Sequence, residues 1–340
     1  MLNTARFMCL FAVLGLNFFA DDFSHASDMS NRNRGPFSDP GVVVSMPDDW
    51  LRQGIRHKVG HKADLAITLD QQLYPIILPL IHEFAAAEKK TIAVENGTCG
   101  ISAGSLSEKT VDIGGYCCPP GELDRLPGLR FHTLGIGAIA LIENPLNQLE
   151  NISLTEVRNL FGGQMTHWSQ LPVSGFKADR SAPIKPVTRL HCKSRPGHWK
   201  LIIDDESEFS QISMDVSSIQ DMIRMVSGFP FGIGYETLWH IQQNADRFKV
   251  KILKVGGNDP SDAKALARGD YPFYRVFNLT TWENSESANP LADKLVEFLL
   301  NNSNRINPGT GIVTAQQLRK NGWAFAGNEL VGEPGSGAAN

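Results

Sequence analysis

The sequence has no excess of positive charge and lacks several common catalytic signatures. Its 32 Lys and Arg residues stand against 36 Asp and Glu, for a formal net charge of -4. Such a chain has little with which to neutralise a phosphate backbone, so nucleic acid is not an expected partner. There is no HExxH or P-loop sequence, and no CxxC or CxxCH spacing. These absences remove the usual signatures of zinc proteases, NTP-binding proteins, thioredoxin-like redox proteins and covalent haem attachment.

No apolar run after the first residues approaches the length of a membrane span. Residues 7–20 form an apolar stretch of 14 residues behind Arg6, shorter than the roughly 20 that a spanning helix needs. Small residues at Ser24 and Ala26 suit signal peptidase. We therefore expect a signal peptide over residues 1–26, with an uncleaved anchor as the alternative, and a periplasmic or secreted mature protein.

Cysteine is scarce, with five residues in 340. Cys9 belongs to the expected signal peptide, which leaves Cys99, Cys117, Cys118 and Cys192 in the mature chain. An even number of cysteines in an oxidising compartment usually indicates disulfides.

The length and the 42% hydrophobic content predict about two globular domains. Short apolar runs predict strands at 65–69, 91–95 and 111–114. Helical spacing of apolar residues predicts helices at 71–88 and 99–106 between them. This alternation is typical of an α/β fold, in which helices cover a parallel sheet.

The middle of the chain is predicted to form an inserted lobe. Two glycine-punctuated strands, 131–142 and 231–235, bracket a middle segment, and they are expected to act as a hinge with ligand bound between the lobes. A capping box at Ser153 opens a helix at 156–161. The other expected elements are strands at 184–190 and 249–255 and helices at 217–226 and 291–301.

These elements predict the domain boundaries. Residues 27–63 are expected to form a loose leader with at most one edge strand. Lobe 1 is expected to comprise 64–138 and 238–326, and lobe 2 the inserted 139–237. Residues 327–340, rich in Gly and Ala, are expected to form a flexible tail.

Several runs resemble, in order and spacing, the phosphate-type substrate-binding proteins of ABC importers. The resemblance covers residues 65 to 300 and rests on these runs: Val111–Gly114, Ile136–Pro145, Leu154–Gly163, Thr166–Trp168, Pro186–Arg189, Gly232–Tyr235 and Tyr271–Pro272. It implies a type II periplasmic-binding-protein fold, an α/β architecture in which each of two lobes has a central mixed or parallel sheet flanked by helices. It also implies an extracytoplasmic solute-binding protein that is monomeric, is not an enzyme and has no cofactor. Its expected partner is an ABC permease or a membrane sensor, to which it would pass the solute.

The resemblance also implies where a ligand would bind. Receptors of this kind hold an oxyanion with helix N-termini, hydroxyl groups and an arginine. The loops so placed are Asp70–Gln72, Gly97–Ser102 and Arg189–Gly197. The implied ligand-binding residues are Gln71, Thr98, Cys99, Gly100, Tyr116, Cys117, Arg189, Ser194 and Arg195.

The sequence departs from the family at these loops. Cys99 stands in a loop that usually carries Ser-Ser-Gly, and Cys117 and Cys118 stand where an Asp is common. Arg189 keeps its place, but the Ser-Gly-Thr that usually follows it is replaced by a run containing Cys192.

Several interpretations of these loops remain open. One is disulfides, either Cys99 or Cys117 with Cys192, or a vicinal Cys117–Cys118 pair. Another is a soft-metal or thiophilic site, such as one for Zn, Cu(I) or arsenite, with ligands from Cys99, Cys117, Cys118, Cys192 and His191. A third is an altered anion site using Arg189, Lys193 and Arg195. Two further alternatives concern the function of the whole protein. It could be a sensory protein that kept the fold, or a hydrolase centred on Ser194.

Overall fold

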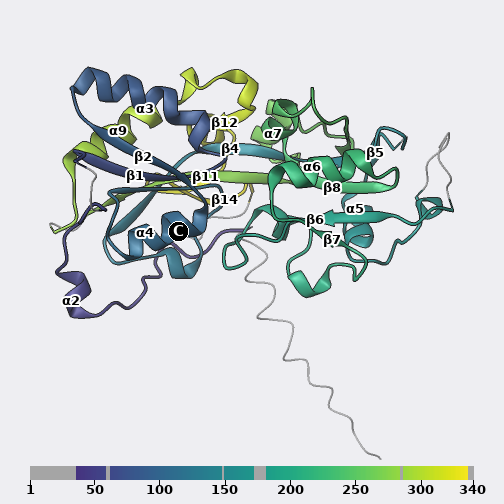
Figure 1. The fold of residues 1–340 in the computed structure, drawn as a ribbon, viewed down its shortest axis with the longest axis horizontal. Coiled ribbons are helices and arrows are strands. Elements are labelled where there is room, and N and C mark those ends of the chain that lie inside the picture. Colours follow the sequence, from purple (N-terminus) through teal and green to yellow (C-terminus); the bar gives the residue numbers. More distant parts are fainter. Residues whose placement is uncertain (1–35, 59–61, 148, 172–180, 284–285, 336–340) are drawn as a thin grey trace, which may run out of the picture. The chain divides into compact units, whose positions relative to one another are not determined.

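The structure is a computed structural model that describes residues 36–58, 62–147, 149–171, 181–283 and 286–335 (Figure 1). The expected signal peptide lies outside the described residues. Among the described residues no helix is both long and apolar enough to cross a bilayer.

One ten-stranded mixed sheet organises the described part of the chain, in the order β2-β1-β3-β11-β4-β8-β6-β7, with β9 and β12 also paired to β4. Parallel pairs join β1 to β2 and β3, and β6 to β7 and β8, whereas β4 pairs antiparallel with β8 and β11. The strands are β1 (Leu65–Asp70), β2 (Ile92–Gly97), β3 (Ile113–Tyr116), β4 (Leu129–Glu143), β6 (Lys185–Thr188), β7 (Met214–Asp215), β8 (Gly232–Thr237), β9 (Lys251–Ile252), β11 (Tyr274–Trp282) and β12 (Ile312–Thr314). The predicted α/β class with a mixed sheet is confirmed.

Lobe 1 is built on β1, β2 and β3 and on the helices α3 (Tyr74–Glu88), α4 (Cys99–Ser107) and α9 (Pro290–Asn301) (Figure 1). The apolar residues of α3 recur at helical spacing, so Ile77, Ile81 and Phe84 are buried in one core with Leu295 of α9. Pro75 lies in the first turn, where its missing N–H costs nothing, and the helix continues through Pro79.

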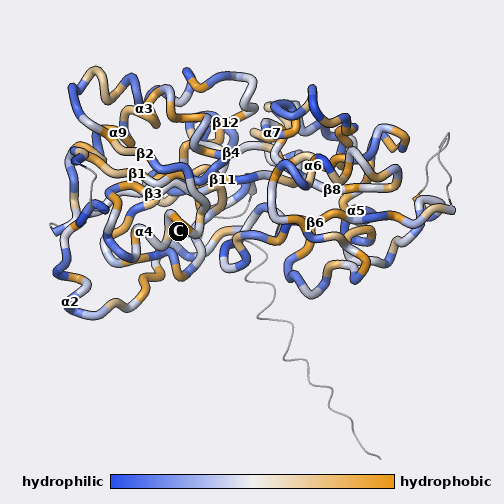
Figure 2. Tube along the Cα trace, in the orientation of Figure 1, coloured by the Kyte–Doolittle hydropathy of each residue, from blue (hydrophilic) through white to orange (hydrophobic). Residues whose placement is uncertain are grey.

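Lobe 2 has a separate core beneath α5 (Leu154–Phe161), α6 (Ile219–Gly228) and α7 (Leu238–Gln243). The predicted capping box is present: the Ser153 hydroxyl accepts from the backbone N–H of Glu156, whose carboxylate accepts from the backbone N–H of Ser153. Hydropathy colouring shows apolar segments in the elements of both lobes, consistent with two cores (Figure 2).

The return crossing between the lobes differs from the prediction. We expected it at 231–235, but β8 pairs with Ile139–Glu143 and therefore stays in lobe 2. Leu253, Val255 and Tyr271 also lie in the lobe 2 core, so the lobe extends past 237 to about 273. The chain returns on β11, which pairs with β4 from Ala138 back to Leu129. The long strands β4 and β11 are thus the two connections between the lobes.

The leader and the tail are more ordered than predicted. Residues 36–58 contain no strand but a short helix, α2 (Asp48–Leu51), whose Trp50 is buried in the lobe 1 core. Within the expected tail, β14 (Glu329–Gly332) pairs with β13 (Ala324–Ala326). Leu330 of that hairpin is buried, and Glu329 forms an ion pair with Arg125.

The remaining elements are short. They are β5 (Asn151–Ile152), β10 (Lys254–Val255), α8 (Ala263–Arg268), α10 (Ala315–Lys320), and the 3-10 turns η1 (Glu122–Asp124), η2 (Trp168–Gln170), η3 (His198–Leu201), η4 (Glu206–Glu208), η5 (Ser303–Arg305) and η6 (Pro308–Thr310).

Candidate functional site

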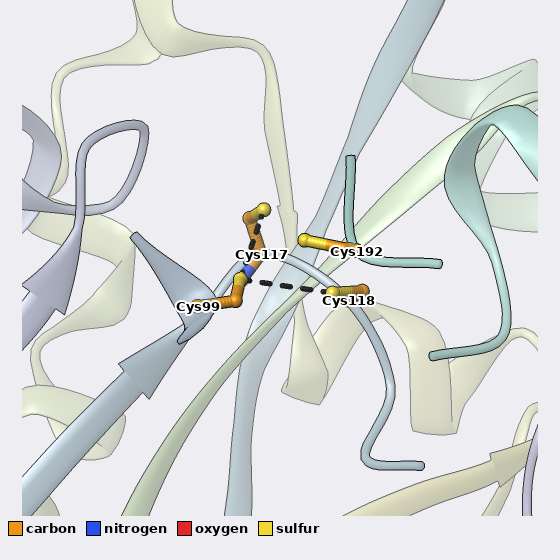
Figure 3. A group of neighbouring side chains, drawn as sticks. All are labelled: Cys99, Cys117, Cys118 and Cys192. Carbon is orange, nitrogen blue, oxygen red and sulfur yellow. Dashed lines mark hydrogen bonds between the residues drawn. The ribbon is translucent and has the colours of Figure 1, made fainter. Parts of the chain in front are cut away.

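Four cysteines from three separate loops meet in one place (Figure 3). Cys99 is the first residue of α4, Cys117 and Cys118 directly follow β3, and Cys192 lies in the loop after β6. Their sulfur atoms all lie within 4.8 Å of one another. We call these four residues the cysteine cluster.

The topology explains why the lobe 1 cysteines converge. β1 pairs parallel with both β2 and β3, so the segments that follow β2 and β3 leave the same edge of the sheet, on either side of β1. The carboxyl ends of parallel strands are where ligands bind in open α/β sheets. The Thr98 hydroxyl accepts from the Ile101 N–H and caps α4, which fixes Cys99 at the first turn of the helix.

The cluster consists of free thiols. The Cys99 sulfur lies 3.3 Å from that of Cys117 and 3.7 Å from that of Cys118. A disulfide requires about 2.05 Å, so these two pairs are not bonded. Since all four cysteines are free, the disulfides considered from the sequence, of Cys192 with Cys99 or Cys117 or between Cys117 and Cys118, are not formed in the structure either. Cys99, Cys117 and Cys118 are fully buried, whereas Cys192 is partly exposed.

Hydrogen bonds link the cluster to charged neighbours. Nη1 of Arg275 lies 3.4 Å from the Cys117 sulfur, and the Cys99 thiol donates to the Asp70 carboxyl at 3.6 Å. Burial raises the pKa of Cys99, whereas hydrogen bonds from the other three thiols lower the pKa of Cys192. The arrangement therefore favours a thiolate that the neighbouring thiols share.

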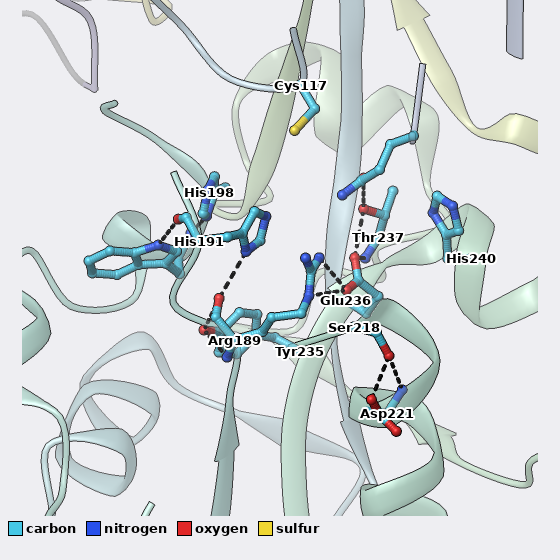
Figure 4. A network of polar contacts seen from close by, with 12 residues as sticks. Cys117, Arg189, His191, His198, Ser218, Asp221, Tyr235, Glu236, Thr237 and His240 are labelled. Carbon is cyan, nitrogen blue, oxygen red and sulfur yellow. Dashed lines mark hydrogen bonds and ion pairs between the residues drawn. The ribbon is translucent and has the colours of Figure 1, made fainter. Parts of the chain in front are cut away.

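Arg189, the arginine expected to hold an anion, is instead paired within lobe 2 (Figure 4). Its Nη2 donates to the Glu236 carboxylate at 2.7 Å, and the side chain is only 3% exposed. Nη2 of Arg275 approaches the other oxygen of Glu236 at 3.5 Å. Burial alone would raise the pKa of Glu236, but the two guanidinium groups outweigh it and lower the pKa, so the carboxylate stays ionised. The charge of Arg189 is therefore already balanced.

Arg195, the second candidate arginine, joins the two lobes. It forms a 2.5 Å ion pair with Asp124 of η1 in lobe 1, and both side chains are buried. The two loops approach closely, since a Cβ added to Gly121 would lie 2.5 Å from the Ser194 carbonyl oxygen. The loop that carries Cys192 is therefore packed against lobe 1.

The other residues expected from the resemblance do not form a polar cradle. Thr98, Gly100 and Ser194 are exposed, and Gln71 is half-buried. Tyr116 is buried beneath the Arg195 guanidinium, and its hydroxyl has no hydrogen-bond partner among the described residues.

Two histidines lie beside Cys192. His191 and His198 stack with ring centroids 4.4 Å apart, and one nitrogen of each lies within 4.8 Å of the Cys192 sulfur. Nδ1 of His191 lies 3.0 Å from the Arg189 carbonyl and Nε2 lies 3.4 Å from Arg275. Both nitrogens of His191 are thus engaged, which disfavours it as a metal ligand. His198, like His191, flanks Cys192 in the sequence, which indicated imidazole groups beside this thiol.

A family model described as the PBP superfamily domain matches residues 58–303, which is more than half of the chain. The chain belongs to the PBP superfamily. This confirms the family that the sequence runs indicated.

Known relatives of this PBP-superfamily chain include phosphate receptors. It is 23% identical over 239 residues to the phosphate-binding protein PstS of Bacillus subtilis, covering 69% of this chain and 74% of that protein. Among solved structures it is similar to a putative phosphate ABC transporter substrate-binding protein with bound phosphate from Clostridium perfringens, with a TM-score of 0.61 and 18% identity. It is also similar to an ABC-type phosphate transport receptor from Vibrio cholerae, with a TM-score of 0.57 and 18% identity. In both cases the match covers 74% of this chain and 99% of the other.

A serine motif in this PBP-superfamily chain escaped the sequence analysis. Residues 100–104 read Gly-Ile-Ser-Ala-Gly, which matches the GxSxG pattern of serine hydrolases. Ser102, however, is fully buried inside α4 rather than on a strand-to-helix turn. Its hydroxyl lies within hydrogen-bond distance of two carbonyl oxygens, those of Thr68 and Gly115. Ser102 thus fastens α4 to β1 and β3 and is not placed as a nucleophile.

Proposed function

We propose that the chain is an extracytoplasmic solute-binding protein that captures a thiophilic ion between its two lobes and delivers it to an ABC permease. The membership of the PBP superfamily supports a binding role. The receptors it is similar to are described as phosphate-binding or phosphate transport proteins, which supports a transport role and a small ionic ligand. Residues 1–26, with the features of a signal peptide, support export.

The observation that carries the choice of ligand is the cysteine cluster. Its four sulfurs lie within 4.8 Å of one another at the end of β3 and the start of α4, with one supplied by lobe 2. Thiolates are soft ligands that select soft or borderline ions such as Zn²⁺, Cu(I) or trivalent arsenic over hard oxyanions. The family's hydroxyl-rich loops would have the opposite preference.

The surroundings of the cluster argue against phosphate. Arg189 and Arg195, which would hold an anion, are each paired with a buried carboxylate, Glu236 and Asp124. A phosphate would have to break one of these pairs and leave a buried carboxylate unpaired, which is strongly unfavourable. Ser194 and Thr98 are exposed and do not supply a buried cradle of hydroxyls.

A thermal-shift panel on the full, reduced chain tests the proposal. Phosphate, sulfate and arsenate form one set, and Zn²⁺, Cu(I) and arsenite form the other. Saturation at 100 times Kd stabilises the folded state by about 2.7 kcal/mol, so a true ligand raises the melting temperature measurably. We expect a shift with at least one thiophilic species, abolished in Cys117→Ser. A shift with phosphate that Cys117→Ser leaves intact would overturn the proposal.

A further inference from the structure

Cys192 is the only member of the cysteine cluster that comes from lobe 2. We infer that the four cysteines form one tetrathiolate site for a divalent ion of the zinc group, with Zn²⁺ or Cd²⁺ as occupant, and that Cys192 makes closure of the lobes part of metal binding. This inference rests on the proposed function and specifies its ligand class, since a three-thiolate site for arsenite would not need Cys192.

The spacing of the sulfurs fits a single tetrahedral ion. A metal–sulfur distance of about 2.3 Å places neighbouring sulfurs of a tetrahedron about 3.8 Å apart. The Cys99 sulfur lies 3.3 Å and 3.7 Å from those of Cys117 and Cys118, and all four sulfurs lie within 4.8 Å of one another. Small shifts of buried side chains would bring all four into coordination.

The guanidinium beside the cluster suits an anionic metal centre, whereas the Asp70 carboxyl, 3.6 Å from the Cys99 sulfur, is an acidic neighbour. A divalent ion with four thiolates carries a net charge of about -2. The nearest guanidinium, that of Arg275, shares the single carboxylate of Glu236 with Arg189, so positive charge remains at the Cys117 sulfur, 3.4 Å from Nη1. N–H groups that donate to metal-bound sulfur are typical second-shell partners of such sites.

The backbone of the Cys192 loop has unusual conformations. Cys192 has φ of 54° and His198 has φ of 42°, a region that residues with a side chain rarely adopt. The indole Nε1 of Trp199 donates to the His191 carbonyl at 2.6 Å and holds the loop in this form. Such conformations persist where the surrounding structure imposes them, and they are concentrated at functional sites. Here the imposed conformation directs the Cys192 thiol toward lobe 1.

The loop that carries Cys192 also contacts lobe 1 directly. It is fastened to lobe 1 by the Arg195–Asp124 ion pair and by the close approach of Ser194 to Gly121. A bond from the metal to Cys192 would add a second link between the lobes to the one that the Arg195–Asp124 pair makes, and would favour the closed arrangement of the structure over any more open one. Without Cys192 the metal would bind to lobe 1 alone.

Cobalt spectroscopy tests the ligand set. The full chain is purified under argon with reductant and titrated with Co²⁺ as the probe, because thiolate-to-cobalt charge transfer grows with the number of thiolates and d–d bands report tetrahedral geometry. We expect one equivalent to bind to the wild type, and Zn²⁺ to displace it. Cys192→Ser is expected to keep binding with about a quarter less charge-transfer intensity and at least tenfold weaker affinity. Ser207→Ala, an exposed serine of lobe 2, is the control and should match the wild type.

Small-angle X-ray scattering with Cd²⁺ tests the closure. The radius of gyration should fall when Cd²⁺ binds to the wild type and to Ser207→Ala, and should not change in Cys192→Ser at a concentration that saturates it. If Cys192→Ser gives the wild-type cobalt spectrum, affinity and compaction, the inference is wrong. If arsenite still binds to that variant, the proposed function survives this failure. If no thiophilic species binds to the wild type, both fail together.

Discussion

At the scale of single residues, the main feature of the site is that its arginines are already paired with buried carboxylates. Sequence analysis placed Arg189 correctly at the end of β6 but assigned its charge to a ligand. The partner, Glu236, lies 47 residues later on a neighbouring strand. Local sequence carries no sign of that pairing, because it depends on β6 and β8 lying side by side in lobe 2. The convergence of the cysteines, in contrast, followed from their positions in three loops of the expected sheet edge.

We predict that Arg189→Ala mainly destabilises the fold. It leaves the Glu236 carboxylate buried with Arg275 at 3.5 Å as its remaining cationic partner, and removing one member of a buried ion pair costs about 3–5 kcal/mol. Urea unfolding measures the loss. The double variant Arg189→Ala/Glu236→Gln should recover part of it. Unchanged stability, together with a loss of phosphate affinity, would instead assign Arg189 to an anion site.

A second residue-scale prediction concerns Glu143, a fully buried carboxyl at the end of β4 whose oxygens have no hydrogen-bond partner among the described residues. Burial raises its pKa from 4.5 to about 8, with Lys251 only partly offsetting the effect at 3.7 Å. The folded state therefore holds a proton that the unfolded state releases, so the contribution to stability is complete below about pH 4.5 and is lost as pH rises to 8.

The slope from this one group is at most about 1.4 kcal/mol per pH unit. Glu143→Gln should remove it, so the variant should be more stable than the wild type at pH 9 and similar at pH 4. Thermal unfolding across this range measures the difference. Parallel pH profiles for the two proteins would show that Glu143 is ionised in the folded state.

At the scale of elements, the sequence predicted most helices and strands of both lobes. The Ser153 capping box is present where expected, and α3, α4 and α9 lie within a few residues of their predicted bounds. The main omission was β11, although Tyr274–Trp282 is rich in β-branched and aromatic residues. Because all nine of its residues are buried, it shows no alternation of polar and apolar positions. Without β11 the return crossing was assigned to β8.

The C-terminal hairpin is the element whose removal should have the clearest effect. A chain ending at Gly327 loses the buried Leu330 and the Glu329 carboxylate, which accepts from Arg125 at 2.7 Å. Arg125 is then left buried without its carboxylate, at a cost of about 3–5 kcal/mol. Glu329→Gln isolates the ionic part and should destabilise less than the truncation. Wild-type stability after truncation would show that the hairpin contributes nothing to the fold.

At the scale of the whole molecule, two lobes with separate cores are joined by β4 and β11, and the loops that meet at their junction carry cysteines. The resemblance to phosphate receptors predicted the fold, and the site that it implies remains a prediction. It did not predict the pairing of the two arginines with buried carboxylates, and thiols stand where the family usually carries hydroxyls. A monomeric state and an ABC permease as partner remain predictions.

We propose that the site takes a thiophilic ion in place of phosphate. Isothermal titration of one reduced sample of the full chain, first with phosphate and separately with Cd²⁺, tests it most directly. We predict saturable binding of one equivalent of Cd²⁺ and no heat of binding with phosphate. Saturable binding of one equivalent of phosphate, with no specific binding of Cd²⁺, would contradict the account.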